Sequence, residues 1–226
     1  LIDNRNSMRP TRERVLAAAV AFAQHSRPED EIFTLAFNEA VQEVWRPTFV
    51  ADINPAEFAS AMSTAIVARG MTAIYDGIMS GLSRLERARH TRQVLILVSD
   101  GGDNASRAKL EDTIARVRDS DATVYTVALV DPLVKDGNPK LLRRLARLTG
   151  GEAFQPRRVA EVPEAFERIS RDIRNAYTLA YVPTKSGNDM ERRRRAVKVY
   201  VRSPDGRVLS VRTRDGYFEK SREDQP

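Results

Sequence analysis

Oxygen-bearing side chains stand where apolar segments end or a helix begins. Asp3 and Ser7 follow the opening pair Leu-Ile, Thr72 precedes an amphipathic stretch, and Asp100 comes just after the apolar run Val94 to Val98. The carboxyl ends of the strands of a parallel α/β sheet meet at one edge, so these side chains are expected to converge there. Carboxylate and hydroxyl oxygens are the ligands that Mg²⁺ prefers. We therefore take these four residues as candidate metal ligands, with magnesium as the candidate ion.

Arg5 lies between the first two of these residues and brings a different chemistry. A guanidinium group donates hydrogen bonds, accepts none and stays charged. If Arg5 points inward, it would repel a divalent cation, pair with Asp3 or Asp100, and offer a partner's carboxylate a built-in cation. If Arg5 points to solvent, water could complete a weaker metal site. The sequence leaves both alternatives open.

An alternation of strands and helices must position these residues. Continuous apolar runs predict buried strands, and apolar residues at helical spacing predict helices that cover them. The pattern predicts an α/β fold with a doubly wound, Rossmann-like and mostly parallel sheet. A hairpin is expected at one edge, and Ser106, Asp103 and Asn104 are expected to cap the helix that follows them. Strands are predicted at 32–37, 41–45, 94–98, 123–130 and 152–154, and helices at 10–24, 54–66, 72–85, 106–117, 141–148 and 162–173.

After residue 176 the sequence pattern predicts strands and no further helices. Segments 177–182, 197–201 and 208–213 alternate or run apolar, and Pro204-Asp205-Gly206 predicts a turn between the last two. We expect an α/β domain over residues 1–176, an antiparallel β extension over 177–218 packed on it, and a frayed tail over 219–226. In this interpretation Tyr177 and Tyr181 pack in the core.

Composition excludes several classes of function. Of the 226 residues, 42% are hydrophobic and 30% charged, and no apolar run is long enough to span a bilayer. The absence of cysteine excludes disulfides and thiolate metal sites. The net charge of +6 is spread among acidic residues, and the dense run Arg192 to Arg195 is interpreted as a solvated loop. We therefore expect no nucleic-acid partner.

Four residues in three segments carry a resemblance to a known family: Asp3, Ser7, Thr72 and Asp100. Ile2-Asp3 with Ser7, Thr72 with its following helix, and Ser99-Asp100-Gly101 resemble the metal-ion-dependent adhesion site of von Willebrand factor A domains, Asp-x-Ser-x-Ser followed by Thr and Asp. Arg5 stands where that pattern has its first Ser, so the site is degenerate. The resemblance implies a non-enzymatic module that binds a partner protein's acidic side chain through Asp3, Arg5, Thr72 and Asp100.

The later segments Tyr-Thr-Leu-Ala-Tyr-Val-Pro and Arg-Asp-Gly-Tyr-Phe are similar to the tail of a bacterial subgroup of these domains. That similarity implies a secreted or cell-envelope protein. The chain opens inside an apparent strand, so we expect residues ahead of Leu1 to continue it and to carry any targeting signal.

Two rival functions rest on the same residues. Strand-end acids also occur in magnesium-dependent hydrolases, although no general base or phosphate-cradling loop accompanies Asp3 and Asp100 here. A domain of this fold could also serve inside the cell as the partner of an ATPase machine.

Overall fold

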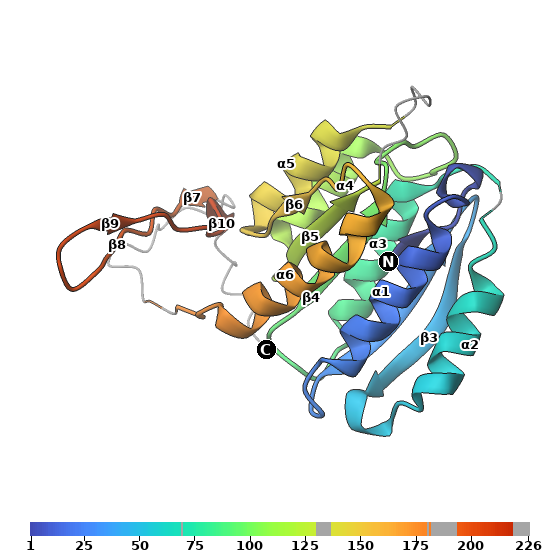
Figure 1. Cartoon of the computed structure of the whole chain (residues 1–226). Helices are drawn as coiled ribbons and strands as arrows, with labels where there is room; N and C mark the ends of the chain where they lie inside the picture. Colours follow the sequence, from blue (N-terminus) through green and yellow to red (C-terminus); the bar gives the residue numbers. More distant parts are fainter. Residues whose placement is uncertain (69, 130–136, 180, 182–193, 219–226) are drawn as a thin grey trace.

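A six-stranded sheet forms the centre of the molecule (Figure 1). The structure, a computed structural model, describes residues 1–68, 70–129, 137–179, 181 and 194–218. The strand order is β3-β2-β1-β4-β5-β6, and all neighbours are parallel except the edge hairpin of β2 and β3. The strands are β1 (Ile2–Asp3), β2 (Glu31–Phe37), β3 (Val41–Phe49), β4 (Val94–Ser99), β5 (Thr123–Ala128) and β6 (Ala153–Phe154).

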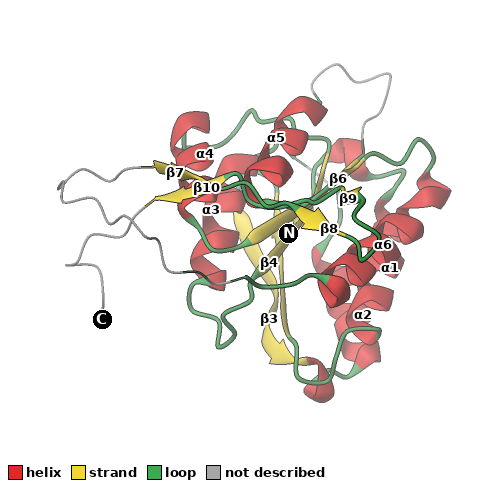
Figure 2. Ribbon diagram, turned by 90° about the vertical axis from the view of Figure 1, so that its left-hand side faces the viewer, coloured by secondary structure: helices red, strands yellow, loops and turns green. Residues whose placement is uncertain are grey.

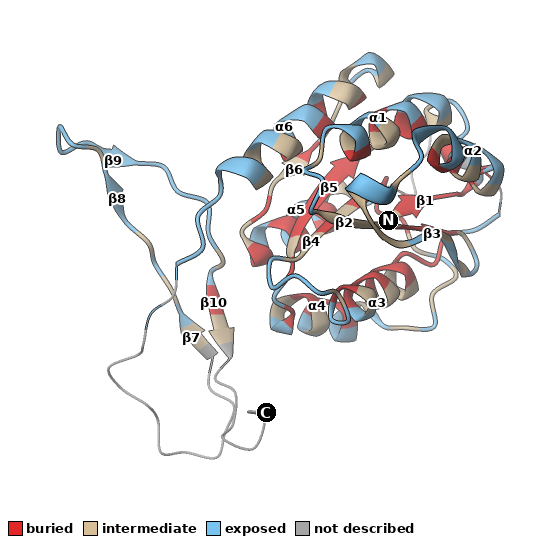
Figure 3. Cartoon of the chain, turned by 90° about the horizontal axis from the view of Figure 1, so that it is seen from below, coloured by how far each residue is buried: buried red, intermediate tan, exposed pale blue. Residues whose placement is uncertain are grey.

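Helices cover both faces of this sheet (Figure 3). One face carries α1 (Arg12–Gln24), α2 (Pro55–Ala65) and α6 (Val162–Asn175), and the other carries α3 (Ile74–Leu85), α4 (Leu110–Asp119) and α5 (Pro139–Thr149). Single 3₁₀ turns, η1 (Asn6–Met8), η2 (Val50–Asp52) and η3 (Val159–Glu161), link some of the elements. The doubly wound α/β fold expected from the sequence is confirmed. Among the helices of the described residues, none combines the length and apolar character needed to cross a membrane.

Local sequence signals set the bounds of two helices as predicted. The Asn54 side chain accepts hydrogen bonds from the backbone of Ala56 (3.0 Å) and Glu57 (3.3 Å), and Pro55 fills the first position of α2. Helix α5 ends at Thr149, and the following Gly150 has a φ of +80°, the left-handed conformation that suits glycine.

The cap predicted for α4 is wrong. That helix begins at Leu110, and the preceding Lys109 gives it no side-chain cap. The loop after β4 instead crosses to α3, where Ser106 Oγ accepts hydrogen bonds from Tyr75 (3.0 Å) and Asp76 (3.3 Å). Asp103 Oδ1 accepts another from Ile74 (3.0 Å), and Asn104 Oδ1 accepts one from Thr72 (2.8 Å). The reason is that α3 begins after Ala73, which has no side-chain oxygen of its own.

The C-terminal extension forms two small antiparallel pairs, β7 (Arg194–Ala196) with β10 (Gly216–Phe218) and β8 (Val201–Arg202) with β9 (Val208–Leu209) (Figure 2). These strands are shorter than predicted. Residues 177–179 and 181 form no strand, while 182 and 219–226 lie outside the described residues. Core packing of Tyr177 and Tyr181 is also wrong, because they are 92% and 59% exposed. Among the described residues, no strand pairs with 177–179 or 181, and the Tyr181 ring instead makes an edge-to-face contact with Tyr217 (6.2 Å between ring centroids).

The basic run is not a loop where the structure describes it. Arg194 and Arg195 belong to β7, and Arg192 lies outside the described residues.

Candidate functional site

The candidate residues lie at the carboxyl edge of the sheet, in the loop after β1, the segment ahead of α3 and the turn after β4. Asp3 ends β1 and Asp100 follows β4, and these strands are neighbours that pair through Ile2 and Val98. Thr72 lies just ahead of α3. Asp3 and Thr72 are fully buried, and Asp100 is 1% exposed. Ser7 lies in η1, and its side chain is outside the described part of the structure.

Arg5 points into this edge. Its side chain is buried, with the residue 6% exposed, and Nη2 forms an ion pair with Asp100 Oδ2. Nη1 donates a long hydrogen bond to Thr72 Oγ1 (3.4 Å). Of the two orientations that the sequence leaves open, the inward one is present. The guanidinium therefore connects the loop after β1 to the turn after β4, through Asp100, and to the segment ahead of α3, through Thr72.

Asp3 is held by one donor from β4 and one from its own loop. Its Oδ2 accepts a hydrogen bond from Ser99 Oγ (2.7 Å), and its Oδ1 accepts one from the backbone N–H of Arg5 (3.1 Å). Burial raises the pKa of the Asp3 carboxyl to about 6, although both hydrogen bonds and the charge of Arg5 oppose this shift. Desolvation dominates because the carboxyl has no access to water.

The turn after β4 fixes Asp100. Its Oδ1 accepts a hydrogen bond from Gly102 N–H (3.0 Å), and its carbonyl accepts one from Asn138 N–H (2.8 Å). Gly101 has a φ of +87°, and a Cβ at this position would collide with the Asn138 carbonyl. The glycine is therefore required both by the backbone conformation and by the close approach of the loop ahead of α5.

Sequence reasoning missed the role of Asn4. This residue is 4% exposed, its Nδ2 donates to the Ala65 carbonyl (3.2 Å), and its Oδ1 accepts from Ala68 N–H (2.6 Å). Ala68 has a φ of +53°, an uncommon conformation for a residue with a side chain. Asn4 thus ties the chain ahead of Thr72 to β1. An amide next to the strand-end acid was the only available signal, because the contact spans more than sixty positions of sequence.

Exposed side chains lie near the buried cluster in sequence. Met71, directly before Thr72, is 50% exposed, and Val67, five positions before it, is 43% exposed. Arg9, which follows η1, and Arg107, in the loop after β4, are also exposed. We call Arg9, Val67, Met71 and Arg107 the edge rim.

Among the described residues, no group of three or more His, Cys, Asp or Glu side chains is arranged to hold a metal ion.

Comparison with known proteins assigns the chain to a family. The model of the von Willebrand factor type A domain matches residues 1–168, most of the chain. The chain belongs to the von Willebrand factor type A family. Domains of this family are generally protein-interaction modules. No curated protein matches the sequence.

Solved structures of this type share the fold at low identity. A von Willebrand factor type A structure from Catenulispora acidiphila is 21% identical, with a TM-score of 0.64 over 75% of this chain and 40% of its own. The PilB minor pilin of Streptococcus sanguinis is 11% identical (TM-score 0.60; 76% of this chain, 59% of that one). An aerotolerance-related membrane protein from Bacteroides fragilis, in a form with multiple mutations to serine, is 13% identical. Its TM-score is 0.52, over 76% of this chain and 96% of its own. The present chain thus spans less than two thirds of the first of these proteins.

Proposed function

We propose that this von Willebrand factor A domain binds a protein partner at its carboxyl edge without a divalent cation. The observation that carries the proposal is the buried ion pair of Arg5 with Asp100, which uses a carboxylate oxygen that a metal would need. The same guanidinium engages the hydroxyl of Thr72, the second candidate ligand. In this proposal Arg5, and not a metal ion, links the loop after β1 to Asp100 and Thr72.

A magnesium ion does not fit this arrangement. Mg²⁺ requires several oxygen ligands in near-octahedral geometry, and here a cationic group occupies the space between Asp100 and Thr72. Two unit charges of the same sign 4 Å apart repel by about 4 kcal/mol at the effective dielectric near a protein surface, and a divalent ion doubles that repulsion. Metal entry would require Arg5 to leave its buried position.

The rim favours a partner with an acidic surface and an apolar contact residue. Arg9 and Arg107 supply exposed positive charge, and Met71 and Val67 supply exposed apolar area. Opposite charges steer association and set specificity, whereas a few residues that become fully buried in the interface contribute most of the affinity. The residues expected to contact a partner have little exposed surface, so in this proposal the exposed residues near them in sequence make the contact: the buried residues are Asp3, Arg5, Thr72 and Asp100.

We also infer a location in the cell envelope or outside the cell. Two of the similar structures come from proteins described as a membrane protein and as a minor pilin. The C-terminal segments, which resemble a bacterial subgroup common in exported proteins, agree with this location.

Site-specific crosslinking tests the proposal directly. A photo-reactive residue at position 71 should capture a partner in the source organism, whereas the same residue at position 167, exposed on α6, should not. The adduct should survive EDTA and should decrease at least several-fold when Arg9 and Arg107 are both changed to Glu. Loss of the adduct in EDTA, or capture from position 167 alone, would contradict metal-independent binding at this edge.

A further inference from the structure

Helix α5 carries an exposed face made of cationic side chains alone. Its members follow the spacing i, i+3, i+4 and i+7, which places them on one side of a helix: Lys140, Arg143, Arg144 and Arg147. The helix has no acidic residue, whereas the net charges of α1, α2, α3, α4 and α6 all lie between −1 and +1. The whole chain has 37 Lys and Arg against 31 Asp and Glu, so these four residues account for most of its net charge of +6. We call them the α5 basic face.

The α5 basic face makes no polar contact within the part of the chain that the structure describes. None of its four side chains forms a hydrogen bond or an ion pair there, although Arg84 and Arg116 on the neighbouring helices pair with Glu43 and Glu86. Repulsion between like charges at these spacings lowers helix stability, and the helix dipole disfavours Lys140 in the first turn. An anionic surface outside the protein would offset this repulsion.

The apolar side of α5 is already buried in the domain. Leu141, Leu142 and Leu145 are at most 5% exposed and belong to the core that also contains Val124 of β5. In a sequence, a basic amphipathic helix indicates either a membrane surface or a protein groove that receives its apolar side. The buried leucines exclude the groove, and they also exclude insertion of the helix among acyl chains. Only contact through the cationic side is left.

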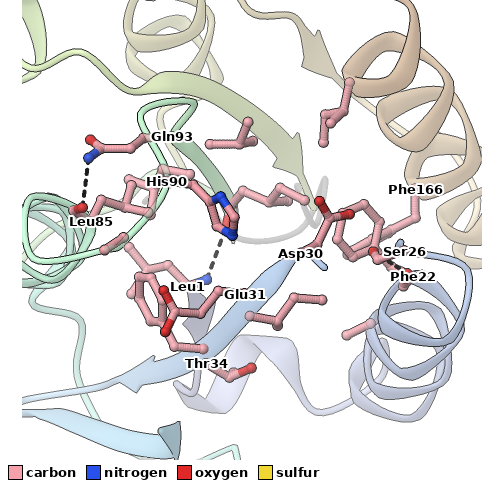
Figure 4. A pocket seen from close by; sticks show the side chains of 18 of the residues that line it. Leu1, Phe22, Ser26, Asp30, Glu31, Thr34, Leu85, His90, Gln93 and Phe166 are labelled. Atoms are coloured by element: carbon pink, nitrogen blue, oxygen red, sulfur yellow. Dashed lines mark hydrogen bonds between the residues drawn. The ribbon is translucent and has the colours of Figure 1, made fainter. Parts of the chain in front are cut away.

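This face suits an extended anionic surface better than a small anion. A small ligand needs a cavity with converging polar groups. The apolar cavity of about 280 Å³ within the sheet is lined by Phe22, Leu85 and Phe166, among others (Figure 4), and residues of α5 are not among those that line it. By contrast, clusters of about four to eight Lys or Arg on a helix are typical of contact with anionic lipid headgroups.

The C-terminal extension adjoins α5 and favours a bilayer over a nucleic acid. Gly150, directly after α5, packs closely against the backbone of Thr213 and Arg214. Of the ten large apolar side chains that are exposed among the described residues, eight belong to this extension, with Tyr200 at 75%. Residues 194–218 also contain seven Lys or Arg against two Asp. The headgroup region of a bilayer accepts aromatic, apolar and cationic side chains together, whereas the phosphates of a duplex would leave the apolar ones in water.

We infer that the α5 basic face docks on the surface of a lipid bilayer that contains anionic headgroups. The contact is peripheral, because the helix keeps its apolar side in the domain core. Three of the four cations are arginines, whose planar guanidinium can donate two parallel hydrogen bonds to one phosphate.

Vesicle sedimentation with the whole chain tests this inference. Vesicles of equal parts phosphatidylcholine and phosphatidylglycerol should bind the protein at low salt, and vesicles of phosphatidylcholine alone should not. Changing all four residues of the α5 basic face to Gln should lower the affinity at least about fiftyfold, because each Lys or Arg near an anionic bilayer strengthens binding roughly fivefold. High salt should act in the same direction.

The matched control removes the same charge from exposed arginines of other elements, by changing Arg14, Arg27, Arg46 and Arg87 to Gln. It should lower the affinity by less than about threefold. Equal losses in the two variants, or equal binding to the two kinds of vesicle, would overturn the inference. A DNA duplex or polyglutamate that binds as tightly as the anionic vesicles, at the same concentration of negative charge, would also overturn it.

A labelling experiment locates the contact even if the fourfold variant does not fold. The chain has no cysteine, so Arg144→Cys places a single thiol on α5, and Arg14→Cys places one on α1, across the sheet. Anionic vesicles with nitroxide-labelled headgroups should quench a fluorophore at position 144 and leave one at position 14 bright. Equal quenching at both positions, or none at position 144, would refute docking through α5.

Discussion

Arg5 stands where the family pattern has its first Ser, and its guanidinium places a positive charge against the buried carboxylate of Asp100. Its substitution by Ser restores the hydroxyl of the family pattern and leaves Asp100 buried without its cation. We expect Arg5→Ser to lower the free energy of unfolding by about 3 kcal/mol, the usual cost of breaking a buried ion pair. Millimolar Mg²⁺ or Mn²⁺ should restore part of this loss, because a ligand that binds only the folded state stabilises it.

The measurement is the unfolding midpoint with and without the ion, together with isothermal titration. The matched control is Arg9→Ser, which removes an exposed arginine four positions away and should change neither quantity. Binding of Mg²⁺ by the wild-type protein would show that Arg5 does not exclude the metal.

Asp3 gives the protein a pH dependence of defined sign. Its pKa is about 6 in the folded state against an ordinary value of 3.8, so the folded state holds a proton that the unfolded chain has released. This residue's contribution to stability is present below pH 3.8 and is lost as the pH rises to 6. The loss amounts to roughly 3 kcal/mol at most. Urea unfolding between pH 4 and 6.5 should show this decline relative to Asp3→Asn.

Other carboxylates change stability in the same range, so the informative quantity is the difference between the two proteins. Glu13→Gln removes one exposed carboxylate from α1 and should follow the wild-type curve. A constant difference between wild type and Asp3→Asn over this range would mean that Asp3 titrates alike in both states.

The start of α3 depends on the loop after β4. Asp103 accepts hydrogen bonds from Ile74 N–H (3.0 Å) and Ser106 Oγ (2.5 Å), and in return Asp76 of α3 accepts from the backbone of Arg107 (3.0 Å) and Ala108 (2.8 Å). Loss of a helix cap costs about 1–2 kcal/mol. Asp103→Ala should lower the free energy of unfolding by that amount and disturb Thr72, whose N–H bonds to the adjacent Asn104.

Chemical denaturation measures the stability change, and the backbone amide NMR signal of Thr72 reports the disturbance. Asp112→Ala, which removes an exposed carboxylate in the first turn of α4, serves as the comparison. Equal effects of the two substitutions would contradict a capping role for the loop.

The C-terminal extension is attached to the domain through charged side chains. Arg212 forms ion pairs with Glu152 and with Asp172 of α6 (2.5 Å), and Gly150 packs closely against the backbone of Thr213 and Arg214. The hairpin of β8 and β9 extends beyond this attachment, away from the sheet (Figures 1 and 3). Ion pairs at this exposure contribute little to global stability but can fix an orientation.

Arg212→Ala should therefore broaden the distance distribution between spin labels at Ser210→Cys and Glu164→Cys by several ångströms, while the unfolding free energy changes by less than about 1 kcal/mol. High salt should act in the same direction on the wild-type protein. Arg207→Ala, which removes a pair with Asp205 within the hairpin, should leave the distribution unchanged. An unchanged distribution for Arg212→Ala would show that other contacts hold the extension.

Local interactions made much of the fold predictable. Asn54, Pro55 and Gly150 act on backbone groups within a few positions, so the bounds of α2 and the end of α5 follow from sequence alone. The apolar run of β4 likewise indicated a strand covered on both faces. The order of polar residues at strand ends was enough to predict that Asp3, Thr72 and Asp100 converge.

Contacts between distant segments decided the rest. The direction of Arg5 depends on a carboxylate 95 positions away, and the helix that Ser106 caps depends on which loop the fold brings to it. The exposure of Tyr177 and Tyr181 depends on whether a sheet partner covers them, although their alternation is typical of a packed strand. A sequence determines which bonds and contacts a residue is able to make, but only the tertiary structure decides which partner lies within reach.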